Sequence, residues 1–189
     1  LVNALSAEAE IVVCAPHIQR SASGHSISIG SPLKTREVAF DHAAYALEIE
    51  GTPADCVKLG LNLLQNQGIS IDMVFSGINH GGNLGTDTLY SGTVSAAIEG
   101  AFNGIPSVAV SVNDHFPKHF DYACELALKT LRSAYGRLDS STVLNLNIPD
   151  LPKEEIKGLK FTRLGKREYE NWFSEKHNEE GHKEYWYSG

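Results

Sequence analysis

Apolar residues gather in short runs along most of this chain, and each run is followed by glycine or by polar residues. Runs of this kind are typical of strands that are buried on both faces of a parallel sheet. The clearest runs predict strands over Ile11–Ala15, Met73–Ser76, Pro106–Val112 and Val143–Ile148. Weaker patterns predict further strands over Ser26–Ile29, Leu33–Phe40, Ala44–Ile49 and Leu159–Leu164.

Between these runs, apolar residues recur every three or four positions, which predicts helices with one buried face. Thr52 suits the N-cap of one helix, because Pro53 follows it as a favoured first residue. Gly92, Ala96 and Gly100 recur at four-residue spacing in another helix, so that one of its faces could approach the sheet closely. We predict helices over 1–7 (its last turns), 53–68, from about 91, and 120–134.

The alternation of strands and helices indicates an α/β fold, a three-layer sandwich with a mostly parallel sheet. We assign residues 1–165 to this core. Beyond Gly165 the composition shifts to charged and aromatic residues, so we predict that residues 166–189 form a C-terminal extension or hairpin.

Glycine and polar residues that could bind a ligand are concentrated in one loop. The run Ser76-Gly77-Ile78-Asn79-His80-Gly81-Gly82-Asn83-Leu84-Gly85 leaves the Met73–Ser76 strand and leads to the helix near Ser91. In open α/β sheets, ligands bind beyond the carboxyl ends of strands, and a helix N-terminus offers unpaired N–H groups and a positive dipole end to a phosphate. Asn79, Asn83, Ser91 and Thr93 add neutral polar groups there. The pattern favours phosphate chemistry.

Other readings of this loop are possible. It lacks the lysine of a P-loop, and its glycines do not have the spacing of a dinucleotide-binding loop. An ordinary surface loop, in which the glycines merely turn the chain, remains the alternative.

Composition narrows the class of protein. The formal net charge of −7 argues against binding to a nucleic-acid polymer, although a small nucleotide is still compatible with it. The 3 cysteines have no Cys-x-x-Cys spacing, which indicates reduced thiols in a cytoplasmic protein. We expect no membrane segment, because no apolar run approaches the length of a span. The chain begins at Leu1 rather than Met, and we expect it to be part of a longer protein.

Several motifs together resemble the SurE-type survival proteins. They occur in the family's order along nearly the whole chain: Gln19-Arg20-Ser21-Ala22-Ser23-Gly24-His25-Ser26, Gly51-Thr52-Pro53-Ala54-Asp55-Cys56, Ser76-Gly77-Ile78-Asn79, Tyr90-Ser91-Gly92-Thr93-Val94 and Asn145-Leu146-Asn147-Ile148-Pro149. The resemblance implies a Rossmann-like core, a metal-dependent nucleotidase, and a homodimer or homotetramer. In this family the oligomer is built from a C-terminal extension, which implies that residues 166–189 serve oligomerisation. The expected substrates of the nucleotidase are nucleoside 5'-monophosphates, with 3'-monophosphates and short polyphosphate as further possibilities.

The resemblance also implies roles for particular residues. Ser21 and Asn79 match the family's two neutral metal ligands, and Asn83, Ser91, Gly92 and Thr93 match its phosphate-holding residues; Asn79 and Ser91 are our catalytic candidates. The family's two other ligands are adjacent aspartates, which would lie upstream of Leu1. A serine and an asparagine alone would hold Mg²⁺ or Mn²⁺ poorly, because these hard cations prefer carboxylate oxygens. A module that binds a nucleotide or phosphate without hydrolysing it is therefore the alternative function.

Two further expectations concern single features. Asp55 is a candidate general base, but its place in the first turn of a helix explains it equally well through the helix dipole. In a doubly wound sheet the first strand lies centrally, so we expect an upstream strand between Ile11–Ala15 and Met73–Ser76. Direct pairing of these two segments would contradict that expectation.

Overall fold

The computed structural model describes residues 1–168 and 173–187, and over these residues the strands form two three-stranded sheets and a two-stranded hairpin. The strands are β1 (Val12–Pro16), β2 (Thr35–Glu37), β3 (Tyr45–Ile49), β4 (Val74–His80), β5 (Ser107–Val112), β6 (Val143–Ile148), β7 (Phe173–His177) and β8 (Lys183–Tyr187). The α-helices are α1 (Val2–Leu5), α2 (Pro53–Asn66), α3 (Gly92–Phe102) and α4 (Asp121–Ala134), and the short 3-10 helices are η1 (Gly85–Tyr90) and η2 (Lys153–Glu155).

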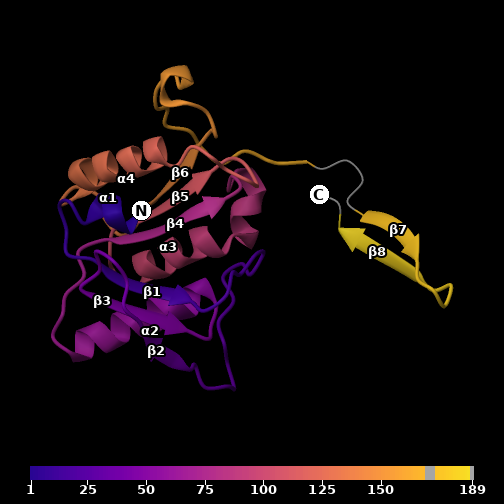
Figure 1. The fold of residues 1–189 in the computed structure, drawn as a ribbon, viewed down its shortest axis with the longest axis horizontal. Helices are drawn as coiled ribbons and strands as arrows, with labels where there is room; N and C mark the ends of the chain where they lie inside the picture. Colours follow the sequence, from indigo (N-terminus) through magenta and orange to yellow (C-terminus); the bar gives the residue numbers. More distant parts are fainter. Residues whose placement is uncertain (169–172, 188–189) are drawn as a thin grey trace.

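One sheet is parallel throughout and has helices on both faces. Its strands lie in the order β4-β5-β6, with β5 fully buried in the middle. The α3 helix packs on one face beside α2, and α4 with α1 covers the other (Figure 1). Val108, Val110 and Val112 of β5 pack with Ala123 and Ala127 of α4 in the largest core cluster. This arrangement confirms the predicted three-layer α/β fold.

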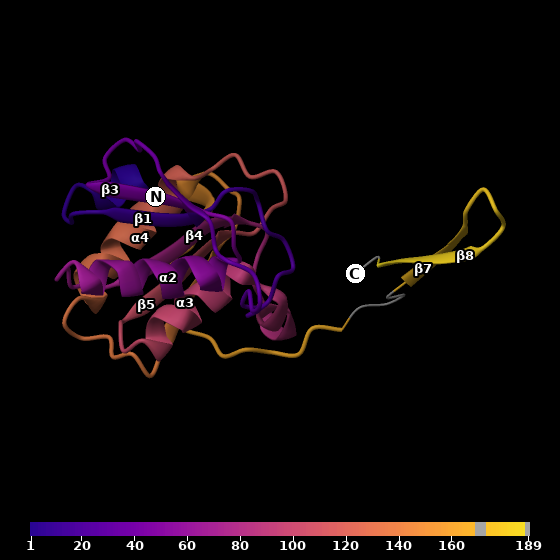
Figure 2. The ribbon, with the colours of Figure 1, turned by 90° about the horizontal axis from the view of Figure 1, so that it is seen from below.

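The other sheet has the order β1-β3-β2 and packs against α2. The β1 and β3 strands are parallel, whereas β2 is antiparallel to β3. Among the described residues β1 pairs with β3 and β4 with β5, so the direct pairing of β1 with β4 that would contradict an intervening strand does not occur. Figure 2, seen from below, shows the same set of elements with α2 and α3 side by side.

The helix boundaries follow the predicted capping residues. Thr52 is the N-cap of α2 and forms a capping box with Asp55. Gly68 follows the end of α2 at a φ of +76°, a conformation that favours glycine. Ser91 caps α3 by accepting a hydrogen bond from the Val94 N–H at 3.1 Å.

Three predicted strands are wrong in part or entirely. Residues 26–29 are not a strand, because their polar groups bond to Thr52 and Asp55 rather than to a neighbouring strand. Residues 159–164 are also irregular; Phe161 is 90% exposed and has no apolar surface to pack against among the described residues. The strand predicted over 33–40 is reduced to the three residues of β2.

The β4 strand differs from the prediction in the opposite sense. It continues to His80, with a register shift between Ser76 and Asn79, so that Asn79 lies in the strand and not in the loop that follows. The glycine-rich loop starts at Gly81, whose φ of +102° favours glycine.

The C-terminal part of the described chain is an antiparallel hairpin of β7 and β8, which lies apart from the two larger sheets in Figures 1 and 2. The predicted extension over 166–189 also includes residues 169–172 and 188–189, which lie outside the described residues. Over the residues that the structure describes, no helix has both the length and the apolar character that a membrane crossing requires.

Candidate phosphate site at the start of α3

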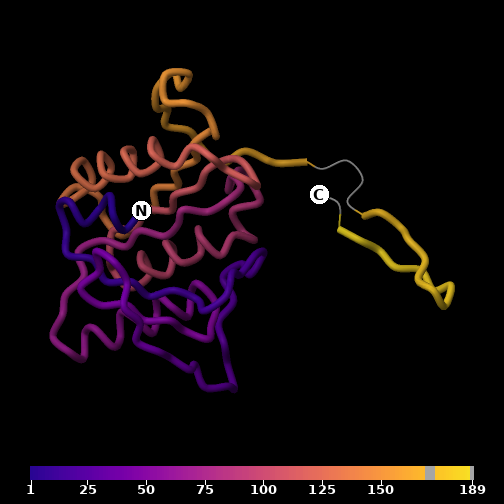
Figure 3. The backbone as a smooth tube through the Cα atoms, in the orientation of Figure 1, coloured from indigo at the N-terminus to yellow at the C-terminus, as the bar shows by residue number. Residues whose placement is uncertain are grey.

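The carboxyl ends of β1, β4, β5 and β6 lie at the same side of the molecule, as the arrowheads in Figure 1 show. The connection between β1 and β2, residues 17–34, makes a long excursion toward that side before it turns back (Figure 3). We call this connection loop 17–34. It meets the start of α3 there.

Asn79 joins β4 to α3. Its side-chain oxygen Oδ1 accepts a hydrogen bond from Oγ1 of Thr93 at 3.2 Å. Its amide Nδ2 donates to the carbonyl oxygens of His80 and Gly81, at 3.2 Å and 2.8 Å. These bonds orient the amide so that its oxygen, a hard ligand atom, faces the first turn of the helix. The Ser76–Asn79 and Ser91–Val94 motifs are thus brought together.

The first turn of α3 has the features of an anion site. The Ser91 hydroxyl oxygen serves as the cap and satisfies the Val94 N–H, while the Ser95 N–H bonds to the Ser91 carbonyl at 3.0 Å. The N–H groups of Gly92 and Thr93 precede the first intrahelical bond, so they have no partner within the helix. They offer hydrogen-bond donors at the positive end of the helix dipole, next to the Thr93 hydroxyl, whose single proton is donated to Asn79 Oδ1.

Loop 17–34 is docked on this same turn. The Gly24 N–H donates to the carbonyl oxygen of Tyr90 at 2.9 Å. Ser23 packs against Gly92 so closely that a Cβ built on Gly92 would lie 2.5 Å from the Ser23 Oγ. That Oγ is buried and has no hydrogen-bond partner within the part of the chain that the structure describes. Ser21, the predicted metal ligand, is exposed two residues earlier in the same loop.

Asn83 has a different position from the other candidates. Its side chain is buried, and its Nδ2 donates to Ser111 Oγ at 2.7 Å. Its backbone N–H donates to Asn147 Oδ1 at 2.7 Å, and its carbonyl accepts from the Asn145 and Asn147 amides. These bonds tie the glycine-rich loop to β5 and β6. They give Asn83 a role in holding the loop, beside the phosphate contact that the sequence predicted.

The network around Asn83 was missed as a set of site residues. Asn145 and Asn147 lie on one face of β6, and Ser111 pairs with Asn147 in the neighbouring strand. The sequence did contain a sign of this network: Asn145 and Asn147 stand two positions apart in an otherwise apolar strand. Polar residues in such positions need a buried polar partner.

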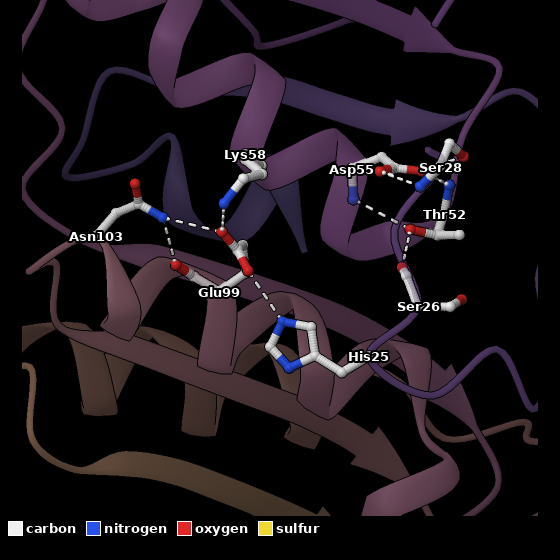
Figure 4. Close-up of polar contacts among 8 residues, drawn as sticks. All are labelled: His25, Ser26, Ser28, Thr52, Asp55, Lys58, Glu99 and Asn103. Carbon is white, nitrogen blue, oxygen red and sulfur yellow. Dashed lines mark hydrogen bonds and ion pairs between the residues drawn. The ribbon is translucent and has the colours of Figure 1, made fainter. Parts of the chain in front are cut away.

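Two buried carboxylates lie beneath loop 17–34, one on α2 and one on α3 (Figure 4). Asp55 accepts bonds from the Ser28 N–H, the Ser28 hydroxyl and the Thr52 N–H, at 3.0, 2.7 and 2.9 Å. Burial raises the pKa of Asp55, but these hydrogen bonds outweigh it and hold the pKa below the ordinary value. Both oxygens are thereby engaged in holding the loop and the helix cap, which favours the structural reading of Asp55 over the general base.

Glu99 is the second buried carboxylate. It accepts hydrogen bonds from Lys58 and His25, each at 2.9 Å. Burial raises the pKa of Glu99, and the bonds from Lys58, His25 and Asn103 more than offset this, so that its pKa lies below the ordinary value. Glu99 is the single charged residue of α3, which otherwise consists of apolar and small residues, and that pattern is the sign by which it could have been noticed.

The predicted metal ligands lack the carboxylate oxygens that a divalent cation prefers. Ser21 and Asn79 offer two neutral oxygens, and the described residues contain no group of three His, Cys, Asp or Glu side chains that could hold an ion. Mg²⁺ and Mn²⁺ prefer carboxylate oxygens. The described residues alone therefore do not fit a complete divalent-metal site.

Comparison with known proteins gives a consistent result. Residues 1–171 match the family model described as "Survival protein SurE". A protein named "5'-nucleotidase SurE" from Petrotoga mobilis is 44% identical to this chain; the aligned region covers 95% of this chain and 71% of that protein. A protein of the same name from Pelotomaculum thermopropionicum is 46% identical, over 100% of this chain and 73% of its own length. The crystal structure of the SurE protein from Aquifex aeolicus superposes with a TM-score of 0.83 at 40% identity, over 98% of this chain and 74% of that one.

The matched range, residues 1–171, includes loop 17–34, the end of β4 and the start of α3. On these grounds, the chain belongs to the SurE family.

Proposed function

We propose that this protein is a phosphomonoesterase that hydrolyses nucleoside 5'-monophosphates to nucleoside and inorganic phosphate. The observation that carries the proposal is the hydrogen bond between Thr93 and Asn79, which joins the end of β4 to the first turn of α3. The names of the relatives, 5'-nucleotidases at 44–46% identity, support the substrate class.

In this proposal the phosphate of the substrate lies against the start of α3. The N–H groups of Gly92 and Thr93 and the hydroxyl of Ser91 donate to its non-bridging oxygens. The Thr93 hydroxyl, which donates its single proton to Asn79 in the free protein, turns to donate to the phosphate when the substrate binds. Water attacks phosphorus, the bond from phosphorus to the nucleoside oxygen breaks, and one proton of the water ends on that oxygen, so that nucleoside and inorganic phosphate are released. Negative charge on the non-bridging oxygens is stabilised by these donors. Asn79 orients the Thr93 hydroxyl, and Asn83 holds the loop that precedes the helix.

We further propose that hydrolysis requires a divalent cation, Mg²⁺ or Mn²⁺, to which Ser21 and Asn79 contribute neutral oxygens. Carboxylate ligands would complete such a site, and the described residues do not supply them as a cluster. Because the residues of the site meet phosphate rather than the base, 3'-monophosphates and short polyphosphate are included among the substrates to be tested.

The test is steady-state phosphate release from AMP, GMP, CMP and UMP, as 5'- and 3'-monophosphates, with Mg²⁺, Mn²⁺ or EDTA. We expect release with a divalent ion and none with EDTA. If no nucleotide is hydrolysed with any common divalent ion, the proposal is wrong. Calorimetry would then show whether the protein instead binds nucleotides without turnover.

A further inference from the structure

The Glu99 carboxylate connects three parts of the fold that the sequence separates (Figure 4). The side chain of Glu99 is only 5% exposed. Its Oε2 accepts from Nε2 of His25 in loop 17–34, and its Oε1 accepts from Nζ of Lys58 in α2 and from Nδ2 of Asn103, at 2.9, 2.9 and 3.2 Å. The negative charge of Glu99 is therefore compensated by Lys58, and the bond from His25 connects the carboxylate to loop 17–34.

The contact of Glu99 with His25 is specific in chemistry and in orientation. An ionised carboxylate can only accept hydrogen bonds, so His25 must carry its proton on Nε2. The imidazole also stacks on Phe102, with ring centroids 5.6 Å apart and planes at 14°. Two residues of the same helix thus fix the position of the His25 ring.

Neighbouring bonds hold the residues on either side of His25. Gly24 bonds to Tyr90 before it, and after it the Ser26 carbonyl accepts from the Thr52 hydroxyl at 2.7 Å. Ser28 is held by Asp55. The segment that follows Ser23 is therefore held by both α2 and α3. On α3 it is held through the side chain of His25, which bonds to Glu99.

We propose that Glu99 and His25 are positioning residues: their bond fixes loop 17–34 against α3 and so sets where Ser21 and Ser23 lie relative to Thr93. The inference rests on the proposed function. Its physical basis is that a displacement of about 1 Å in a group that orients the reaction can reduce the rate by about a hundredfold. Lys58 bonds to the same carboxylate from α2, and within the described part of the chain no hydrogen bond or ion pair joins Lys58 to loop 17–34, so its loss should affect the position of the loop much less.

This asymmetry defines a matched set of variants of the full chain. His25→Ala removes the partner of Glu99 on the loop, and Lys58→Met removes its partner on α2. His25→Gln is the conservative variant, because the glutamine amide nitrogen can occupy the place of the histidine Nε2 and donate to Glu99. Each is assayed with AMP at a temperature where it is fully folded, and amide hydrogen exchange is followed over residues 20–28.

We expect His25→Ala to lower kcat/KM by about tenfold or more, with faster exchange over residues 20–28 and unchanged exchange in β5. Lys58→Met should lower the melting temperature but keep kcat/KM within about twofold and the exchange of the loop unchanged. His25→Gln should recover most of the loss.

The inference is overturned if His25→Ala keeps kcat/KM within twofold, if Lys58→Met reduces kcat/KM as much as His25→Ala, or if the loss in His25→Ala only follows a loss of folded protein. A wild-type protein that hydrolyses no nucleotide would contradict the proposed function. In that case the exchange data still decide whether the bond between His25 and Glu99 orders the loop.

Discussion

The Oδ1 atom of Asn79 lies 3.2 Å from the Oγ1 atom of Thr93, so that a strand residue and a helix residue fourteen positions apart share one hydrogen bond at the start of α3. The amide nitrogen of Asn79 is already engaged with the backbone of the following loop. The Thr93 hydroxyl is therefore oriented from one side by a side chain that cannot rotate freely. This relationship makes each of the two residues a direct test of the site.

Thr93→Val should impair catalysis far more than stability. Valine keeps the shape of the side chain and removes one hydroxyl, so the free energy of unfolding should fall by about 0.5–1.5 kcal/mol. We expect kcat/KM for AMP to fall by about 10- to 100-fold, because one donor to the phosphate is lost. Thr130→Val is the control: it removes a hydroxyl that bonds to the Leu126 carbonyl on α4. Equal kcat/KM in the two variants would exclude Thr93 from the site.

Asn79→Ala should strongly lower the metal-dependent activity while the fold stays intact. Alanine removes the side-chain oxygen and does not open a cavity in the apolar core, because the Asn79 side chain is bonded to Thr93 and to the loop. The expected result is a strong loss of activity and a higher concentration of Mg²⁺ or Mn²⁺ for half-maximal rate. Circular dichroism checks the fold. A rate that depends on metal as in the wild type would contradict the assignment of Asn79.

Local sequence patterns predicted those strands and helix ends that depend only on neighbouring residues. Strands such as β6 and caps such as Thr52 were correctly predicted, because burial in a parallel sheet and capping chemistry leave direct marks in the sequence. Residues 26–29 look like a strand locally, but Asp55 and Thr52, distant in sequence, satisfy their polar groups. Local patterns do not reveal such partners.

In the candidate site, too, local motifs predicted some features, whereas contacts between distant residues were missed. The start of α3 could be inferred from the motifs, and the structure brings Asn79 and Thr93, two of the predicted site residues, into contact. The bond between His25 and Glu99 joins residues 74 positions apart, so neither residue alone signals it. The burial of Asn83 likewise depends on β5 and β6, which follow it in the chain.

Gly92→Ala should displace loop 17–34 from the start of α3. The new Cβ would lie 2.5 Å from the Ser23 Oγ and 2.8 Å from Cγ of Pro53, so the loop or the helix must move. We expect a loss of about 1–3 kcal/mol in the free energy of unfolding and a marked loss of activity. Gly165→Ala is the control, since a Cβ there meets no atom within 4 Å. Urea unfolding and AMP hydrolysis measure the two effects; wild-type activity in Gly92→Ala would show that this close contact is dispensable.

The two buried carboxylates should make stability depend on acid pH. The folded-state pKa values of Glu99 and Asp55 lie below 4.5 and 3.8, their ordinary values. The folded protein therefore binds fewer protons than the unfolded chain in this range. Their contribution is complete above about pH 4.5 and is lost as the pH falls through the lower folded-state values.

Asp55→Asn isolates one of these groups. Asparagine keeps the shape but can place an N–H group where Ser28 donates, so we expect a loss of about 1–3 kcal/mol at pH 7. The difference from wild type in urea unfolding should narrow as the pH falls below 3.8, because the Asp55 carboxylate is protonated there in the unfolded chain before it is protonated in the folded protein. The exposed Glu10→Gln serves as the control. A difference that stays constant from pH 7 to pH 3 would show that the charge of Asp55 does not stabilise the fold.

Gly100→Ala tests the close approach of α3 to the parallel sheet. A Cβ at this position would lie 2.5 Å from the Oγ of Ser107 and 3.0 Å from Cβ of Val74. Alanine favours the helix by about 0.5–1 kcal/mol, but overpacking a buried contact costs about 1–3 kcal/mol, so we expect net destabilisation. Because Ser107 is fully buried and its hydroxyl bonds to the Ile105 carbonyl, it cannot simply move away. A second substitution, Ser107→Ala, removes the nearest atom, so the cost of Gly100→Ala should be smaller in that background. Urea unfolding of the four proteins in this cycle measures the coupling, and additive effects would mean that the helix is held apart from the sheet by other contacts.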